Sequence, residues 1–224
     1  MSAYLSAALA VYLKDVRLEA RSKETVGAVL IFALLVAFIF NFAFDATPDI
    51  IAIVGPGIVW VAYVFTGILG LNRTFVLERD RGTLDGLMLA PVGREAIYLG
   101  KLLSAISVML LVEFLMVPVF LVLYDISLLN LWFALAALLA TIGFAAVGTL
   151  FSAIAVHTRA REVLLPLLFL PVVLPVIMAA VAITASVLDG DGWTTATSWL
   201  QLVVAFDIVF LMVSSWAFEF VLEE

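Results

Sequence analysis

Six long apolar stretches constrain this chain more than any other feature, because each has the length of a membrane crossing. They cover residues 26–44, 50–71, 102–124, 128–156, 163–188 and 199–222. A helix needs about 20 apolar residues to cross the hydrocarbon core of a bilayer. With 66% of its residues hydrophobic, the chain also cannot present an ordinary water-soluble surface. We therefore expect an all-α membrane protein with six transmembrane helices, forming one permease domain over residues 1–224.

The basic residues indicate how the chain is oriented. All 11 Lys and Arg residues lie before the first stretch, between the second and third, or between the fourth and fifth. The other connections carry only acidic charges, at Asp45, Asp49, Asp125, Asp189 and Asp191. Because cytoplasmic loops retain Lys and Arg, we expect both termini and the basic loops to be cytoplasmic. The net charge of −7 argues against a nucleic-acid partner, which would need a basic surface.

Residues 1–24 combine an apolar stripe with charges. Leu5, Leu9, Tyr12, Leu13 and Val16 recur at spacings of three and four, which places them on one face of a helix. We expect an amphipathic helix that lies in the membrane interface. A poorly ordered tail is the alternative, because Ser and Ala dilute the stripe.

The connection 72–101, between the second and third stretches, is the most highly charged part of the chain. Its ionised residues are Arg73, Glu78, Arg79, Asp80, Arg81, Asp85, Arg94, Glu95 and Lys101. An ionised group at the bilayer centre costs roughly 2.5–3.5 kcal/mol even on an insertion scale. We therefore expect this segment to lie in water at one membrane face.

A short helix is predicted inside this charged segment. Gly82 breaks the backbone, Thr83 can cap a new turn, and Pro91 ends it. The intervening apolar residues Leu84, Leu87 and Met88 have helical spacing. Such a helix, parallel to the membrane, suits a groove on a soluble partner. The alternative is that the charges only anchor the loop at the lipid headgroups.

Two carboxyl residues, Glu113 and Asp207, fall near the middle of the third and sixth stretches. Ionisable groups at this depth indicate a functional site by default, such as a polar pathway. The alternative is that each is protonated or hydrogen-bonded between helices.

Prolines fall inside the third stretch at Pro118 and inside the fifth at Pro166, Pro171 and Pro175. A proline within a helix removes a hydrogen bond, so the fifth span is expected to be bent or broken. Such breaks either allow movement or only shape the packing.

Residues that carry catalytic or metal chemistry are scarce. The chain has no cysteine, and its one histidine, His157, stands beside Arg159 and Arg161, where a solvated position is favoured. The sequence shows no nucleophile paired with a general base, no metal-ligand cluster and no phosphate-binding GxxxxGK loop. We expect a non-enzymatic subunit with no directly bound cofactor or metal, whose energy comes from elsewhere.

The charged segment and its surroundings resemble a known family. The residues that carry the resemblance are Leu71, Asn72 and Arg73, Glu78, Arg79, Gly82 and Thr83, Leu84 to Val92, Ile97 to Lys101, and the opening Leu13 to Glu24. They are similar to the ABC-2 type exporter permeases and, within these, to the haem exporter protein B family (CcmB) of the cytochrome c maturation system.

This resemblance implies a permease subunit in a prokaryotic inner membrane. It implies a homodimer that binds a cytoplasmic ABC ATPase using ATP and Mg²⁺, a haem-handling membrane protein and a small accessory subunit. ATP hydrolysis in such a complex drives release of a haem-loaded periplasmic chaperone, with the segment Thr83 to Leu89 as the coupling helix. The alternatives are an ABC-2 permease for a drug, lipid or polysaccharide, and an ion-driven carrier that uses Glu113 and Asp207.

Overall fold

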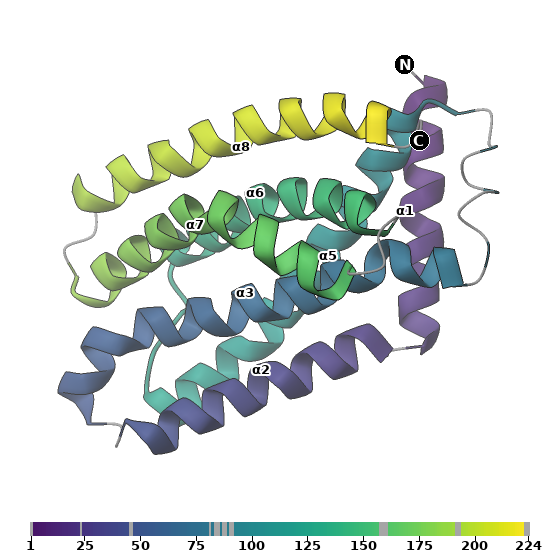
Figure 1. Ribbon diagram of the computed structural model, residues 1–224. Helices are drawn as coiled ribbons and strands as arrows, with labels where there is room; N and C mark the ends of the chain where they lie inside the picture. Colours follow the sequence, from purple (N-terminus) through teal and green to yellow (C-terminus); the bar gives the residue numbers. More distant parts are fainter. Residues whose placement is uncertain are drawn as a thin grey trace.

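Long helices lie side by side in a bundle, and one further helix crosses an end of it (Figure 1). The computed structural model describes residues 2–22, 24–44, 47–80, 82, 86, 89, 92–156, 161–190 and 194–221. The helices in these residues are α1 (Ser2–Ser22), α2 (Glu24–Ala43), α3 (Pro48–Asp80), α5 (Arg94–Tyr124), α6 (Leu131–Val156), α7 (Arg161–Leu188) and α8 (Thr194–Val221). All except α1 are long and apolar enough to cross a membrane. The prediction of an all-α membrane protein with six spans is confirmed.

Two of the spans extend further than their hydropathy indicates. The apolar part of α3 ends at Leu71, but the helix continues to Asp80, and α5 begins at Arg94 instead of Leu102. The connection between them is therefore shorter than the predicted 72–101. Hydropathy predicts a loop for these charged residues because they cannot enter lipid, but a helix can continue past the hydrocarbon boundary and keep its charges.

The helix α6 is the centre of the bundle. It packs against α3, α5, α7 and α8, whereas α2 and α8 lie at the periphery. Its inward positions are small, including Gly143, Gly148 and several alanines. Small residues let neighbouring helices approach closely in a membrane. A Cβ atom added at Gly148 would lie 2.1 Å from a side-chain atom of Leu71, so α3 depends on this gap.

Local capping residues set the turn between α5 and α6. Asp125 adopts the left-handed conformation with φ 55°, and its N–H donates to the Leu121 carbonyl at 3.0 Å, which closes α5. Asn130 accepts a hydrogen bond from the Trp132 N–H at 2.8 Å, which caps the start of α6. The side-chain amide of Asn41 in α2 donates to the Leu123 carbonyl at 2.8 Å and fixes this end to α2.

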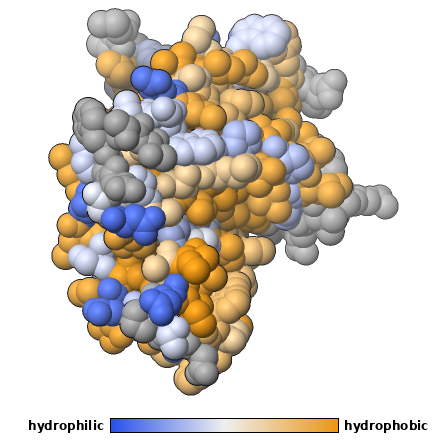
Figure 2. All heavy atoms as spheres, turned by 90° about the vertical axis from the view of Figure 1, so that its left-hand side faces the viewer, coloured by the Kyte–Doolittle hydropathy of each residue, from blue (hydrophilic) through white to orange (hydrophobic). Residues whose placement is uncertain are grey.

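The two ends of the bundle differ in charge. Figure 2 looks onto the end opposite α1, where hydrophilic atoms gather among hydrophobic flanks. The described charged residues at this end are Asp49, Asp125 and Asp189, and all three are exposed. At the other end lie α1, the end of α3, the start of α5 and both chain termini (Figure 1). The Arg94 guanidinium donates to the Glu219 carbonyl at 2.9 Å, which joins α5 to the end of α8.

The prolines do not break their helices. Helix α7 contains Pro166, Pro171 and Pro175 and runs without interruption from Arg161 to Leu188, and Figure 1 shows it as a curved helix. Pro118 likewise lies inside the continuous α5. A bend is compatible with this structure, whereas a broken fifth span is not. Prolines are tolerated in membrane spans because neighbouring helices and side chains can satisfy the backbone groups that a proline leaves without a hydrogen bond.

Candidate functional site

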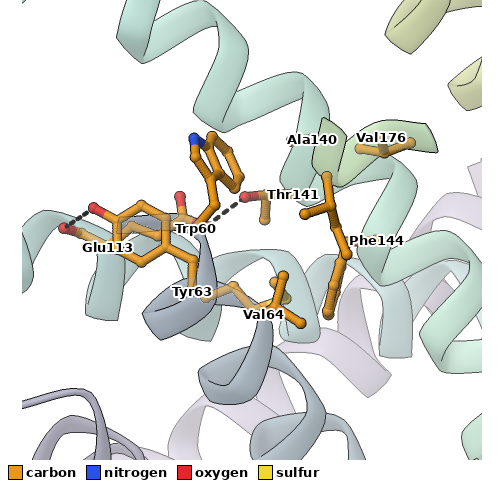
Figure 3. A pocket seen from close by; sticks show the side chains of 10 residues that line it. Trp60, Tyr63, Val64, Glu113, Ala140, Thr141, Phe144 and Val176 are labelled. Carbon is orange, nitrogen blue, oxygen red and sulfur yellow. Dashed lines mark hydrogen bonds between the residues drawn. The ribbon is translucent and has the colours of Figure 1, made fainter. Parts of the chain in front are cut away.

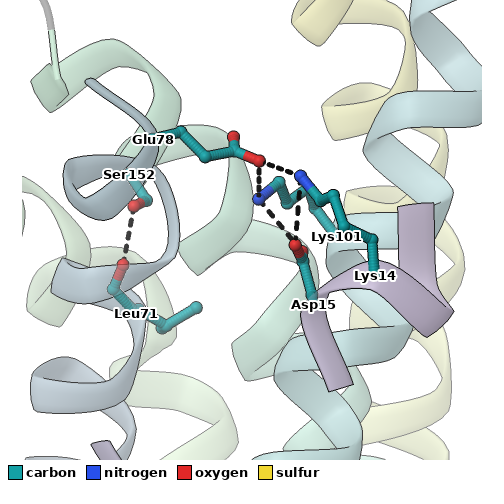
Figure 4. Close-up of polar contacts among 6 residues, drawn as sticks. All are labelled: Lys14, Asp15, Leu71, Glu78, Lys101 and Ser152. Carbon is teal, nitrogen blue, oxygen red and sulfur yellow. Dashed lines mark hydrogen bonds and ion pairs between the residues drawn. The ribbon is translucent and has the colours of Figure 1, made fainter. Parts of the chain in front are cut away.

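A cluster of four charged side chains lies where α1, α3 and α5 meet, and we call it the ion quartet (Figure 4). It consists of Lys14 and Asp15 from α1, Glu78 from α3 and Lys101 from α5. Lys101 is 1% exposed and Glu78 is 7% exposed, measured on their side chains. Buried charges in proteins are paired, and here two cations and two anions give a neutral group.

The contacts in the ion quartet close a ring. Lys101 Nζ lies 3.0 Å from Glu78 Oε1 and 3.0 Å from Asp15 Oδ2. Lys14 Nζ lies 3.3 Å from Asp15 Oδ1 and forms a hydrogen bond with Glu78 Oε1. Each charge therefore has an opposite charge from its own helix or from a neighbouring helix.

The ion quartet also determines the protonation of Lys14. Partial burial by itself would lower the pKa of the Lys14 ammonium. The hydrogen bond with Glu78 and the charges of Asp15 and Glu78 outweigh this effect, so the pKa of Lys14 is raised above its ordinary value of 10.5. Lys14 is therefore fully protonated at neutral pH.

At the start of the same helix, burial and the nearby Glu95 carboxylate raise the pKa of Tyr4.

A glycine allows α1 to approach α5 closely. A Cβ atom added at Gly100 would lie 2.6 Å from Val11 Cβ and 2.7 Å from the Ala8 carbonyl oxygen. Ala8 and Val11 are buried in this contact, and the Tyr12 and Ser107 hydroxyls are 3.2 Å apart beside it. Gly100 immediately precedes Lys101, so the same close approach brings α1 to the ion quartet.

The ion quartet corrects the expectation that all the charges in 72–101 face water. Glu78 and Lys101 are buried inside the chain, so these two charges do not face water. Arg79 and Asp80 complete α3, and Gly82 is exposed with a positive φ of 64°, as expected for a backbone break. The remaining predicted coupling residues lie outside the described residues; they are Arg81, Thr83, Leu84, Leu87, Met88 and Pro91. His157 also lies outside them.

The predicted intramembrane carboxyl Glu113 lines a small internal pocket between α3, α5, α6 and α7 (Figure 3). The Thr141 hydroxyl donates to Glu113 Oε1 at 2.7 Å, and the Tyr63 hydroxyl donates to the Glu113 backbone carbonyl at 3.2 Å. The pocket lining is otherwise mostly apolar, with Trp60, Met109 and Phe144 among its residues. Glu113 thus connects three helices at the level of the hydrocarbon core.

The second intramembrane carboxyl, Asp207, lies elsewhere. It belongs to α8 and packs on α6, where a Cβ at Gly143 would be 2.3 Å from Asp207 Oδ1. Neither side-chain oxygen of this buried residue has a hydrogen-bond partner within the described residues. Asp207 does not line the pocket beside Glu113. The pocket beside Glu113 is therefore not a polar pathway that the two carboxyls share.

The described part of the chain offers little for metal or cofactor chemistry. Within the described residues, no group of three or more His, Cys, Asp or Glu side chains could hold a metal ion. At the α1 end, the contact between Glu78 and Lys101 joins the last turn of α3 to the second turn of α5.

Comparison with known proteins gives a consistent result. The sequence profile described as "CcmB protein" matches residues 6–224. Heme exporter protein B of Rhodobacter capsulatus is 32% identical over 166 residues, which cover 74% of this chain and 76% of the relative. The protein of the same name from Paracoccus denitrificans is 31% identical over 83% of this chain and 86% of its own length. That of Haemophilus influenzae is 29% identical over 80% of each chain.

Proposed function

Because the chain belongs to the CcmB protein family, we propose that it is the permease subunit of an exporter complex in a prokaryotic cell membrane. A cytoplasmic ATPase subunit supplies the energy from ATP and Mg²⁺, and this chain carries the resulting movement through the bilayer. In this proposal the chain is a transport subunit and has no catalytic residue of its own.

One structural observation carries this proposal. Helix α3 continues nine residues beyond its apolar part, from 72 to 80, and its last turn is joined to α5 through Glu78 and Lys101. The segment 81–93 leaves and returns at these joined ends, on the side of the bundle where the basic residues occur. Basic residues favour the cytoplasmic side, so this segment is offered to a cytoplasmic partner. Docking there would move two spans as one unit.

The cargo follows from the relatives and from the charges of the outer end. The relatives are named "Heme exporter protein B", and we propose that this chain serves a haem-handling complex in cytochrome c maturation. The described charged residues at the end opposite α1 are the carboxylates Asp49, Asp125 and Asp189. These repel the propionates of haem. This favours release of a haem-loaded periplasmic chaperone over a haem site in this chain.

The proposed assembly contains several partners. Besides the ATPase, they are a second copy of this chain, a haem-handling membrane protein and a small accessory subunit. The many large apolar side chains exposed on α2 and α8 leave ample area for lipid and for neighbouring membrane subunits.

Charge reversal tests the docking of the ATPase. The variant Arg79→Glu with Arg81→Glu should lose the ATPase subunit during mild-detergent purification. Arg17→Glu with Arg21→Glu changes the charge equally on exposed positions of α1 and should keep it. If both variants retain the ATPase equally, the segment only anchors at the headgroups.

A reporter fused after Glu224 tests the orientation in the membrane. It should be active in the cytoplasm, and activity only outside the cytoplasm would overturn the orientation.

A carrier driven by ions through Glu113 is the second candidate, and the pocket beside this carboxyl is the observation in its favour. The two candidates differ in the need for a partner. A carrier transports in proteoliposomes that contain this chain alone, whereas the proposed permease requires the ATPase and ATP.

A further inference from the structure

The four charges of the ion quartet divide into two pairs. Lys14 and Asp15 are neighbours in α1, and their charged atoms are 3.3 Å apart. Glu78 and Lys101 come from α3 and α5, with 3.0 Å between their charged atoms. Each pair is neutral by itself. The remaining two contacts, between Lys14 and Glu78 and between Lys101 and Asp15, are the ion pairs of the quartet that join α1 to the bundle.

This division matters because of what happens when α1 moves away. A buried ion pair is normally costly to break, since one charge is left without a partner in an apolar environment. Among the ion pairs of the quartet, the departure of α1 breaks the two contacts between the pairs and leaves the contact within each pair intact. Glu78 keeps Lys101, and Lys14 keeps Asp15, so no isolated charge is left in the bundle. Water that reaches the exposed pairs would stabilise them further.

Few side chains of α1 are fully buried in the contact with α5. The described residues of α1 that are buried are Ala8 and Val11. The large apolar side chains Leu5 and Leu9 are about half exposed and lie on a different face. That face suits the hydrocarbon boundary of a membrane interface. Helix α1 would therefore keep its place in the membrane whether or not it contacts α5.

We propose that Lys14 and Asp15 are positioning residues that form a releasable latch. While α1 is latched, they hold the ends of α3 and α5 in one conformation. When an ATPase partner displaces the segment 81–93, Glu78 and Lys101 move as a pair and α1 is released. This inference rests on the proposed function, because it assigns the displacing force to that ATPase.

Cysteine labelling tests the latch directly, because the chain has no native cysteine. In Val11→Cys the new thiol is buried between α1 and α5 while α1 is latched, since Val11 is 8% exposed. With the ATPase subunit bound, the rate of labelling by a water-soluble maleimide is expected to rise roughly ten-fold in one nucleotide state, as for a local opening. Ala10→Cys, at an exposed position of the same helix, serves as the control and should label equally in all nucleotide states.

A charge swap within α1 provides the second arm. The variant Lys14→Asp with Asp15→Lys keeps the composition and net charge of α1, but it places like charges opposite Glu78 and Lys101. In this background, Val11→Cys should label quickly in every nucleotide state, and co-purification of the ATPase should be unchanged. Delivery of haem to cytochrome c should fall without a matching fall in ATP hydrolysis, which a purely structural role would not produce.

The outcomes separate the two hypotheses. If the labelling rate of Val11→Cys is the same in every nucleotide state while the ATPase binds and hydrolyses ATP, the latch is overturned and the proposed function stays intact. Slow labelling of the swapped variant, equal to that of the unswapped chain, also overturns it. If no ATPase binds this chain at all, the proposed function fails, and the swapped variant still reports whether these charges hold α1.

Discussion

The ammonium group of Lys101 lies 3.0 Å from the carboxylate of Glu78, and this contact joins the second turn of α5 to the last turn of α3. Both side chains are almost completely buried. Between them in sequence lies the most charged connection of the chain. The position of this pair means that the charged connection is held at both of its ends by one contact.

Removing one member of this pair is expected to destabilise the protein. In Lys101→Met, the buried carboxylate of Glu78 and the partly buried carboxylate of Asp15 remain, with Lys14 as the one cation of the ion quartet. The cost of an uncompensated buried charge is about 3–5 kcal/mol, and because Lys14 compensates in part we expect roughly 3 kcal/mol, or about 6–12 °C in melting temperature for a chain of this length. Thermal unfolding in detergent measures this shift.

The double variant Lys101→Met with Glu78→Met is the control for that loss. It removes both charges of the pair, so it should recover most of the stability lost in Lys101→Met. If the loss of stability in the double variant equals or exceeds the sum of the losses in the two single variants, the pair does not act as a unit.

The contact between α1 and α5 should be sensitive to one methyl group. In Gly100→Ala the new Cβ would lie 2.6 Å from Val11 Cβ and 2.7 Å from the Ala8 carbonyl oxygen, so α1 must shift. Overpacking of this kind costs about 1–3 kcal/mol. Gly27→Ala, in α2, meets no atom within 4 Å and should be neutral or stabilising because alanine favours a helix. Equal melting temperatures for the two variants would contradict the close approach at Gly100.

The sequence predicts the spans well because hydropathy acts over 20 residues at a time. It predicts their ends less well, since a helix does not have to stop where its apolar residues stop. The continuation of α3 from 72 to 80 and the early start of α5 at Arg94 are of this kind. The charged residues of α3 beyond Leu71 favour a loop by hydropathy, because lipid excludes them, although they continue the helix.

The ion quartet could not be derived from sequence, because Lys14 and Glu78 are 64 residues apart and nothing local connects them. Two signals were nevertheless present. Asp15 falls on the same helical face as Ala8 and Val11, away from the stripe of Leu5 and Leu9. Gly100 beside Lys101 also indicated a close backbone approach. These signals identify a packed face but not its partner.

The two intramembrane carboxyls should respond differently to substitution. Glu113 accepts the Thr141 hydroxyl at 2.7 Å, so Glu113→Leu leaves that buried hydroxyl without its acceptor and should cost about 1–3 kcal/mol. Glu113→Gln keeps an acceptor oxygen and should cost less. Asp207 has no hydrogen-bond partner within the described residues, so Asp207→Ala should cost little or should stabilise. Melting temperatures in detergent compare the three variants, and a larger loss in Asp207→Ala than in Glu113→Leu would contradict this assignment.

The docking of α1 should weaken at alkaline pH because of Lys14. The pKa of Lys14 is raised above 10.5 in the folded chain, since the ion pairs outweigh the effect of burial. A group whose pKa is raised on folding stabilises the folded state fully below its unfolded pKa, and this contribution is lost as the pH rises through the folded pKa. Docking is therefore expected to be constant near neutral pH and to weaken above about pH 10.5. A nitroxide attached at Ala10→Cys reports the change as increased mobility of α1 in its electron paramagnetic resonance spectrum. In Lys14→Met the alkaline step assigned to this amine should be absent, which distinguishes it from the titration of tyrosines. A step of the same size in both proteins would show that Lys14 does not control the docking.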